Sequence, residues 1–315
     1  MKKARTKVTM TSKDSLTLDR GVDLFINNCK CRNLSVHTIK FYENNIHNMF
    51  MFFNGKEKVC NLSKNDVDNY IRFLQDSGRV NDVTTNTYIK ALRAIFYYFM
   101  QEGYITNSFK IQLPKMSEKN IEIYTDDELK ILLKKPNNNN FVAYRNWTII
   151  NFLLGTGCRL NTLINVKVKD IDFKNNTITF TTTKNKKVLL IPLDLTLKKV
   201  LNEYITRTNR KPIDYLFCNC YGEKLIKQTL YTSLCTYAKR RGVNKTGIHK
   251  FRHTFASTWI KKEGSIATLS KILGHSNIAI TDNYIHLLTT DISKNFENYS
   301  CLSTITHSNN KIKIK

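Results

Sequence analysis

Apolar side chains recur at intervals of three and four residues through the first hundred positions of this chain. Three stripes share this spacing: Ile39, Tyr42, Ile46, Met49 and Phe53; Val67, Tyr70, Ile71 and Leu74; and Ile89, Leu92, Phe96 and Phe99. Such spacing places side chains on one face of an α-helix. Ser63-Lys-Asn-Asp66 has the composition of a helix start. The pattern predicts a bundle of about four helices with the aromatic stripes in its core.

The helical spacing lapses between Gly103 and Tyr124, where Pro114 also occurs, and this predicts a linker. Helix resumes at Thr125-Asp-Asp-Glu128, which has the form of a capping box. An apolar helix is expected over Tyr144–Leu154, stopped by Gly155 and Gly157. The chain therefore divides into two parts, each long enough to build a core.

Strand signals are confined to Asp170–Leu193, where the Asn175-Asn176 turn separates the first two strands. Two strand-like runs follow, Thr177–Thr182 and Val188–Leu193, and the chain is again mainly helical from Leu197. The expected fold class is mainly α with a small antiparallel β-sheet.

The charge is strongly unbalanced. Fifty Lys and Arg stand against twenty-five Asp and Glu in 315 residues, a formal net charge of +25. This excess indicates a polyanionic partner, with nucleic acid first and an anionic membrane surface second. The membrane interpretation weakens because no apolar run approaches the roughly 18 residues needed to span a bilayer. The basic start, Met1–Lys7, also lacks the apolar region of a signal peptide, so we expect a cytoplasmic or nucleoid protein.

Eight cysteines are present, including the pairs Cys29/Cys31 and Cys218/Cys220. Two ligands separated by one residue do not match the usual zinc spacings, so we expect reduced thiols and no metal. The segment Tyr215–Cys220 is expected to be a strand with Cys218 and Cys220 on one side of it.

The richest chemistry lies toward the C-terminus. His249, Arg252 and His253 fall at i, i+3 and i+4. A helix over 250–260 therefore brings a guanidinium group and two imidazoles together. An arginine fork matches phosphate oxygens, and histidine exchanges protons near neutral pH. Leu273-Gly-His275 follows, and then Tyr284, whose phenol is a nucleophile once cations or a base activate it.

Upstream segments add further cations. Gly155-Thr-Gly157-Cys-Arg159 places an arginine where one helix ends and another begins, and a helix N-terminus favours anions. Lys184-Asn-Lys186-Lys187 lies between the two strand-like runs, so it is expected to project from a hairpin.

These residues resemble the tyrosine recombinase family, also called phage integrases, whose pattern is Arg, a hairpin Lys, His-x-x-Arg, His and Tyr. The resemblance implies an active site whose members are listed here: Arg159, Lys184, His249, Arg252, His275 and Tyr284. Lys186 is the alternative for the hairpin lysine. The family commonly has a glutamate three residues after the first arginine, and Thr162 stands there instead.

The resemblance also implies a domain plan, an N-terminal SAM-like helical domain that binds core DNA and an α+β catalytic domain. We expect these limits: a basic extension over 1–14, the helical domain over 15–103, a linker over 104–123, the catalytic domain over 124–300 and a basic tail over 301–315.

By this resemblance Tyr284 attacks a DNA phosphorus and forms a 3′-phosphotyrosine, Lys184 is the general acid for the 5′ oxygen and His249 takes the tyrosine proton. No nucleotide, cofactor or metal is expected, because Arg159, Arg252 and His275 can carry the developing charge. His253 and His286 are interpreted as structural.

The implied partner is double-stranded DNA, held by two basic domains and, in the synaptic complex, by a homotetramer. Residues 285–299 are expected to pack against a neighbouring protomer, and an accessory factor to set direction. Four cations lie off the apolar stripes and could contact phosphates: Lys40, Arg72, Lys90 and Arg93. The function that the resemblance implies is site-specific DNA recombination or integration, by an Xer-like recombinase or a mobile-element integrase. The alternatives are a type IB topoisomerase-like enzyme and a DNA-binding protein with a decayed catalytic site.

Overall fold

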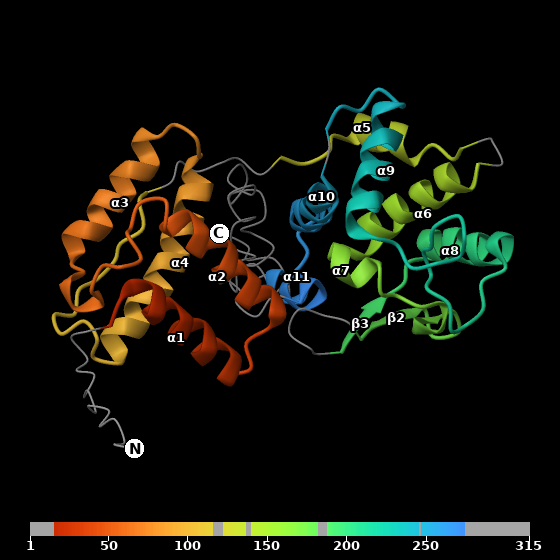
Figure 1. The fold of residues 1–315 in the computed structure, drawn as a ribbon. Coiled ribbons are helices and arrows are strands. Elements are labelled where there is room, and N and C mark those ends of the chain that lie inside the picture. Colours follow the sequence, from red (N-terminus) through yellow and green to blue (C-terminus); the bar gives the residue numbers. More distant parts are fainter. Residues whose placement is uncertain (1–15, 116–121, 137–139, 182–187, 246, 275–315) are drawn as a thin grey trace, which may run out of the picture. The chain divides into compact units, whose positions relative to one another are not determined.

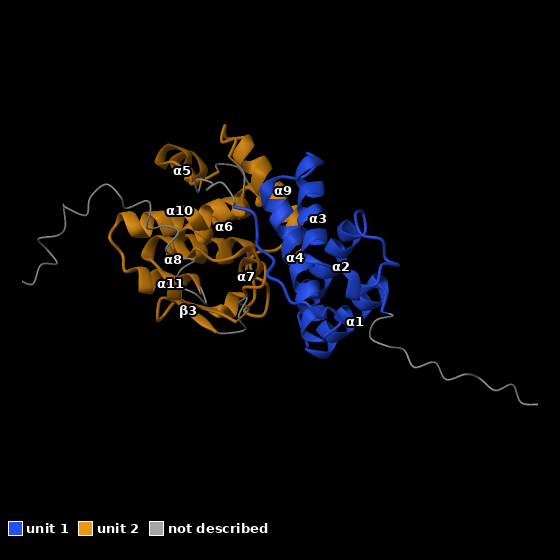
Figure 2. Ribbon diagram, turned by 90° about the vertical axis from the view of Figure 1, so that its left-hand side faces the viewer, with its two compact units in different colours: residues 1–119 blue, residues 120–315 orange. Residues whose placement is uncertain are grey.

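A computed structural model describes residues 16–115, 122–136, 140–181, 188–245 and 247–274. The chain forms two compact units, residues 1–119 and 120–315, which Figure 2 shows in blue and orange. Each unit has its own hydrophobic core.

Unit 1 is the predicted helical bundle. Its helices are α1 (Leu18–Cys31), α2 (Val36–Met49), α3 (Lys64–Asp76) and α4 (Asp82–Gln101), with a 3₁₀ turn, η2, at Val59–Asn61. The α4 helix packs against the other three helices, and the apolar stripe of α4 lies in the core, where Ile89, Phe96 and Phe99 are fully buried. Ser63 and Asp66 form the capping box that begins α3.

The chain after α4 continues along unit 1. Ile105 and Ile111 are buried in the core of unit 1. The backbone N–H of Ile111 donates to the hydroxyl of Tyr97 at 3.2 Å, and the Asn86 amide donates to the carbonyl of Pro114 at 3.2 Å. The helical spacing thus ends at Gly103, but residues 104–114 remain packed on the helices of unit 1.

Unit 2 is built around one largely buried helix, α6 (Phe141–Thr156). Four helices pack against α6: α5 (Asp126–Leu133), α8 (Leu195–Thr208), α9 (Lys227–Lys239) and α10 (Ile248–Lys261), as Figure 1 shows. Ile149, Ile150 and Phe152 of α6 are fully buried. Two further helices, α7 (Leu160–Leu163) and α11 (Ile266–Leu273), complete the helical part of the described residues. Among the described residues, no helix has the length and apolar character needed to cross a membrane.

The sheet of unit 2 is a three-stranded antiparallel meander in the order β1-β2-β3. A 3₁₀ turn, η3 (Val168–Asp170), leads into β1 (Ile171–Asp172), which is followed by β2 (Thr177–Phe180) and β3 (Leu189–Pro192). Asn176, in the turn between β1 and β2, has a φ of 53°, a conformation that asparagine tolerates. The predicted fold class, mainly α with a small antiparallel sheet, is confirmed.

Two local predictions were wrong. Gly155 does not stop α6: the helix continues to Thr156, and Gly157 is its left-handed cap. A Cβ on Gly155 would lie 2.8 Å from Cδ2 of Leu197, so this glycine allows α8 to approach closely. Cys218 and Cys220 do not share a strand face, because Cys218 is buried and Cys220 is exposed. The segment forms no strand and has only two isolated bridges, Tyr215 to Lys167 and Cys218 to Lys224.

Candidate active site

Arg159 stands at the junction of α6 and α7. Gly157 ends α6 with a φ of 60°, Cys158 is buried, and Arg159 is the extended N-cap residue of α7. The cap must be glycine for two reasons. A left-handed φ disfavours other residues, and a Cβ on Gly157 would lie 2.5 Å from Cδ1 of Phe255 in α10. The tight turn therefore directs the half-buried Arg159 side chain toward α10 and α11.

The α10 helix supplies His249 and Arg252, which are one turn apart, as the sequence predicted. The Arg252 side chain is buried. Its Nη1 donates to the carbonyl of Gly157 at 2.8 Å, and its Nη2 donates to the carbonyl of Leu273 at 2.8 Å. The guanidinium is thus held in one orientation between the end of α6 and the end of α11.

The C-terminal end of α11 joins the two arginines. Arg159 Nη1 donates to the carbonyl of Leu273 at 3.2 Å and to that of Gly274 at 3.4 Å, so the Leu273 carbonyl accepts from both guanidinium groups. Gly274 caps α11 with a φ of 61°. Gly157, Leu273 and Gly274 were not predicted as site residues, because they act through backbone carbonyls. The signal available was a glycine before each of Arg159 and His275.

Burial and nearby positive charges lower the pKa of two imidazoles close to the arginines. Partial desolvation of the His249 ring, followed by the charges of Arg252 and Arg159, lowers the pKa of His249 below its ordinary value. Desolvation, then His249 and Arg252, lowers the pKa of His253. Although its ring is partly desolvated, His249 is exposed to solvent. Water or substrate can therefore reach it. A neutral, accessible imidazole beside two guanidinium groups can accept a proton from a group bound there.

The hairpin between β2 and β3 begins close to this cluster. Phe180 pairs with Leu189 at its base. A Cβ built on Gly274 would lie 3.6 Å from Cδ2 of Leu189 and 3.8 Å from Nη1 of Arg159. The predicted lysines, Lys184 and Lys186, lie outside the described residues.

Predicted site residues His275 and Tyr284 also lie outside the described residues, as does His286. Thr162 is buried in α7. Of the four cations proposed to contact phosphates, Lys40, Arg72 and Lys90 are exposed and Arg93 is half-buried. The structure therefore brings together Arg159, His249 and Arg252 from the predicted set.

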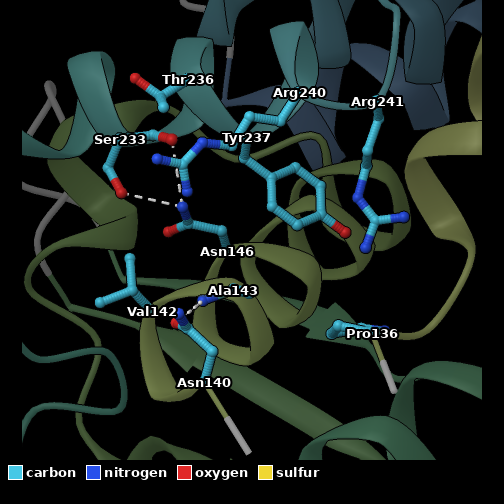
Figure 3. A pocket seen from close by; sticks show the side chains of 10 residues that line it. All are labelled: Pro136, Asn140, Val142, Ala143, Asn146, Ser233, Thr236, Tyr237, Arg240 and Arg241. Carbon is cyan, nitrogen blue, oxygen red and sulfur yellow. Dashed lines mark hydrogen bonds between the residues drawn. The ribbon is translucent and has the colours of Figure 1, made fainter. Parts of the chain in front are cut away.

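A hollow of about 740 Å³ lies elsewhere in unit 2, between the start of α6 and the last turns of α9 (Figure 3). Asn146, Ser233, Arg240 and Arg241 are among its lining residues. Because α6 has 16 residues, its two ends are about 24 Å apart. The arginine cluster lies at the other end of α6, so this hollow is not the site predicted from the sequence.

Comparison with known proteins shows the family of this chain. The model of the phage integrase family matches residues 122–290, and that of the phage integrase N-terminal SAM-like domain matches residues 22–106. The chain belongs to the phage integrase family. It is an enzyme of the tyrosine recombinase class, which cleaves and rejoins DNA strands through a 3′-phosphotyrosine intermediate.

Curated relatives include two Xer proteins. Tyrosine recombinase XerD of Listeria innocua is 27% identical over 280 residues, covering 84% of this chain and 94% of the relative. Tyrosine recombinase XerC of Staphylococcus aureus strain USA300 is 28% identical over 286 residues, covering 88% of this chain and 95% of the relative.

Solved structures share the fold. The Tn1549 transposon integrase, in complex with transposon right end DNA, has a TM-score of 0.72 at 21% identity, covering 85% of this chain and 94% of that one. A lambda integrase dimer bound to a COC′ core site has a TM-score of 0.69 at 16% identity, covering 84% of this chain and 97% of that one.

Proposed function

We propose that Arg159, His249 and Arg252 are half of a six-residue active site for DNA strand exchange. The other members are Lys184, His275 and Tyr284. The observation that carries the proposal is the convergence of Arg159 and Arg252 on the carbonyl of Leu273, beside a histidine with a lowered pKa. Two preorganised guanidinium groups at one point form a receptor for a phosphodiester that gains charge during reaction.

In the proposed reaction, the Tyr284 oxygen attacks the phosphorus and the bond from phosphorus to the 5′ oxygen breaks. His249 accepts the phenol proton, and its lowered pKa keeps a larger fraction of the imidazole in the neutral form that can accept it. Lys184 gives a proton to the departing 5′ oxygen, with Lys186 as the alternative donor. Arg159, Arg252 and His275 stabilise the charge on the phosphoryl oxygens. Attack by another strand's 5′ hydroxyl reverses these steps and rejoins the DNA.

Double-stranded DNA is the proposed partner, and the net charge of +25 supports it. We propose that a helical core-binding domain over 15–103 and a catalytic domain over 124–300, joined by a linker over 104–123, hold the duplex between them. Lambda integrase is a tetramer when bound to a Holliday junction, which supports a homotetramer here, in which residues 285–299 pack against a neighbour. An accessory factor that sets direction completes this proposal.

Covalent trapping tests the proposed site. Nicked duplexes tiled from the DNA flanking the gene are incubated with wild type, Tyr284→Phe and a control, Tyr221→Phe, and denaturation-resistant adducts are measured. Tyr221 is 84% exposed on a loop and makes a matched control. We expect an adduct with wild type and Tyr221→Phe and none with Tyr284→Phe.

Other outcomes separate the alternatives. An adduct that persists in Tyr284→Phe would refute the assignment of the nucleophile. DNA binding without an adduct on any duplex would indicate a decayed site, and relaxation of supercoiled plasmid by a monomer, without pairing of two sites, would indicate topoisomerase-like action.

A further inference from the structure

The segment through which the chain enters unit 2, residues 122–128, lies against α10; we call it the entry segment. Tyr124, the third residue of this segment, is buried. The Tyr124 ring stacks on that of Phe251 with centroids 4.5 Å apart and planes inclined by 22°. The backbone N–H of Tyr124 donates to Oγ1 of Thr254 at 3.0 Å in a buried setting. One stacked ring and one buried hydrogen bond therefore attach the entry segment to the helix that carries His249 and Arg252.

Two lysines reinforce this attachment. Lys245 Nζ, in the loop before α10, donates to Glu128 Oε2 at 3.0 Å and to the carbonyl of Ile123 at 3.3 Å. Lys250 of α10 forms an ion pair with Glu122. Exposed ion pairs contribute little to stability, and Glu122 is exposed. The Lys250–Glu122 pair therefore adds little to the buried contacts of Tyr124.

The entry segment contacts α10 on the side opposite the arginine cluster. Successive residues of an α-helix are rotated by about 100°, so the direction midway between Phe251 and Thr254 lies about 160° from that midway between His249 and Arg252. On the cluster side, Arg252 donates to the carbonyls of Gly157 and Leu273. The α10 helix is thus held between the entry segment on one side and those two carbonyls on the other.

We propose that Tyr124 and Thr254 are positioning residues for His249 and Arg252. This inference rests on the active site proposed above. A displacement of α10 changes the position of the histidine and of the buried arginine together, and a displacement of about 1 Å costs on the order of 100-fold in rate when reacting groups must be aligned. The entry segment is also continuous with the chain that joins the two units, whose boundary is at Lys119 and Asn120.

The test uses the full-length chain and three substitutions in α10. Thr254→Val keeps the side-chain volume and removes the acceptor for the Tyr124 N–H, whereas Thr254→Ser keeps the acceptor. Thr258→Val is the matched control: Thr258 is exposed in the same helix, two residues beyond the buried Ala256.

Two quantities are measured for each variant: the single-turnover rate of adduct formation, with duplex affinity determined separately, and the NMR titration midpoint of the His249 imidazole. We expect Thr254→Val to slow adduct formation by about 10-fold or more, with duplex affinity unchanged. The His249 midpoint should move toward the ordinary histidine value in Thr254→Val. Thr254→Ser and Thr258→Val should match wild type in both measurements.

The two readouts separate this inference from the proposed function. If wild type forms no adduct, the proposed function fails, and the His249 midpoint still reports on positioning. A midpoint in Thr254→Val equal to that in Thr258→Val overturns the positioning role, as does an equal cleavage rate. Should Thr254→Val unfold, Tyr124→Leu replaces it, because this change removes the ring stack and leaves the backbone N–H in place. Wild-type behaviour of Tyr124→Leu in both readouts would then reject the proposal.

Discussion

Arg159 and Arg252 donate hydrogen bonds to the same acceptor, the backbone carbonyl of Leu273, at 3.2 and 2.8 Å. The first arginine caps α7, the second belongs to α10, and the acceptor ends α11. Like charges repel, so the shared carbonyl and the surrounding packing must hold the two guanidinium groups together. This arrangement is favourable for an enzyme whose substrate is an anion, because binding a phosphodiester relieves the repulsion.

Conservative replacement of either arginine should abolish most of the activity. Arg252→Lys keeps a positive charge and loses the fork that reaches both Gly157 and Leu273. We expect adduct formation to slow on the order of 100-fold to 1,000-fold, as for loss of one transition-state donor. The control is Arg240→Lys, in the hollow at the other end of α6, which should cleave at the wild-type rate. Equal effects of the two substitutions would argue against a specific role for Arg252.

Gly157→Ala should destabilise unit 2. The new Cβ would combine a φ of 60° with a contact of 2.5 Å to Phe255. Gly78→Ala is the matched control, since Gly78 has a φ of 59° with nothing within 4 Å of the added Cβ. We expect about 1 kcal/mol of backbone strain for Gly78→Ala and about 1–3 kcal/mol more for Gly157→Ala, measured by urea denaturation. Similar losses of unfolding free energy at both positions would show that the Phe255 side chain moves away from the new Cβ at little cost in stability.

The titration of His249 should follow its charged neighbours. Its midpoint is expected below the ordinary histidine value of about 6.5. Arg159→Gln removes one of the charges that lower the pKa, so the midpoint should rise in that variant. Lys262→Gln removes a charge just after the end of α10 and should leave the midpoint in place. NMR of the imidazole measures both, and an unchanged midpoint in Arg159→Gln would contradict the proposed electrostatic contact.

The same pKa shifts make stability depend on pH. Because the folded pKa of His249 and His253 lies below the unfolded one, the unfolded chain binds protons first as the pH falls. The free energy of unfolding should therefore decrease as the pH drops through the ordinary histidine value toward the lowered folded pKa. His253→Gln should reduce this decrease between pH 7 and about pH 5.5, measured by urea denaturation. A steeper decrease in the variant would mean that the sign of the shift is wrong.

Arg145 should be important for folding rather than for chemistry. Its buried guanidinium donates to the carbonyl of Cys218 at 3.0 Å, to Oδ1 of Asn146 at 3.1 Å and to Oγ of Ser233 at 3.1 Å. Arg145→Met leaves buried acceptors without these donors, at a cost of about 1–3 kcal/mol. Arg207→Met, at a side chain that is 57% exposed, should cost less than about 1 kcal/mol. Urea denaturation compares the two, and equal losses would contradict the burial argument.

Sequence patterns predicted the local structure well, because local structure follows from neighbouring residues. The stripe containing Phe96 predicted α4, the Thr125 and Glu128 pair predicted the start of α5, and the spacing of His249 and Arg252 placed both on one turn of α10. The prediction that Gly155 ends the helix was wrong, since this glycine instead leaves room for Leu197 of α8. A glycine required by a distant contact has the same appearance in the sequence as one that ends a helix.

The amino-acid sequence by itself determined the helices and the hairpin, the excess of positive charge, and the set of residue types that resembles a tyrosine recombinase site. Only the tertiary structure decided that Arg159 and Arg252 meet at the carbonyl of Leu273, and that Tyr124 supports α10 from the opposite side. The physical reason is that every residue has a backbone carbonyl and N–H. Which of them lies within hydrogen-bonding distance of a given side chain depends on how separate elements pack, and no local pattern encodes that.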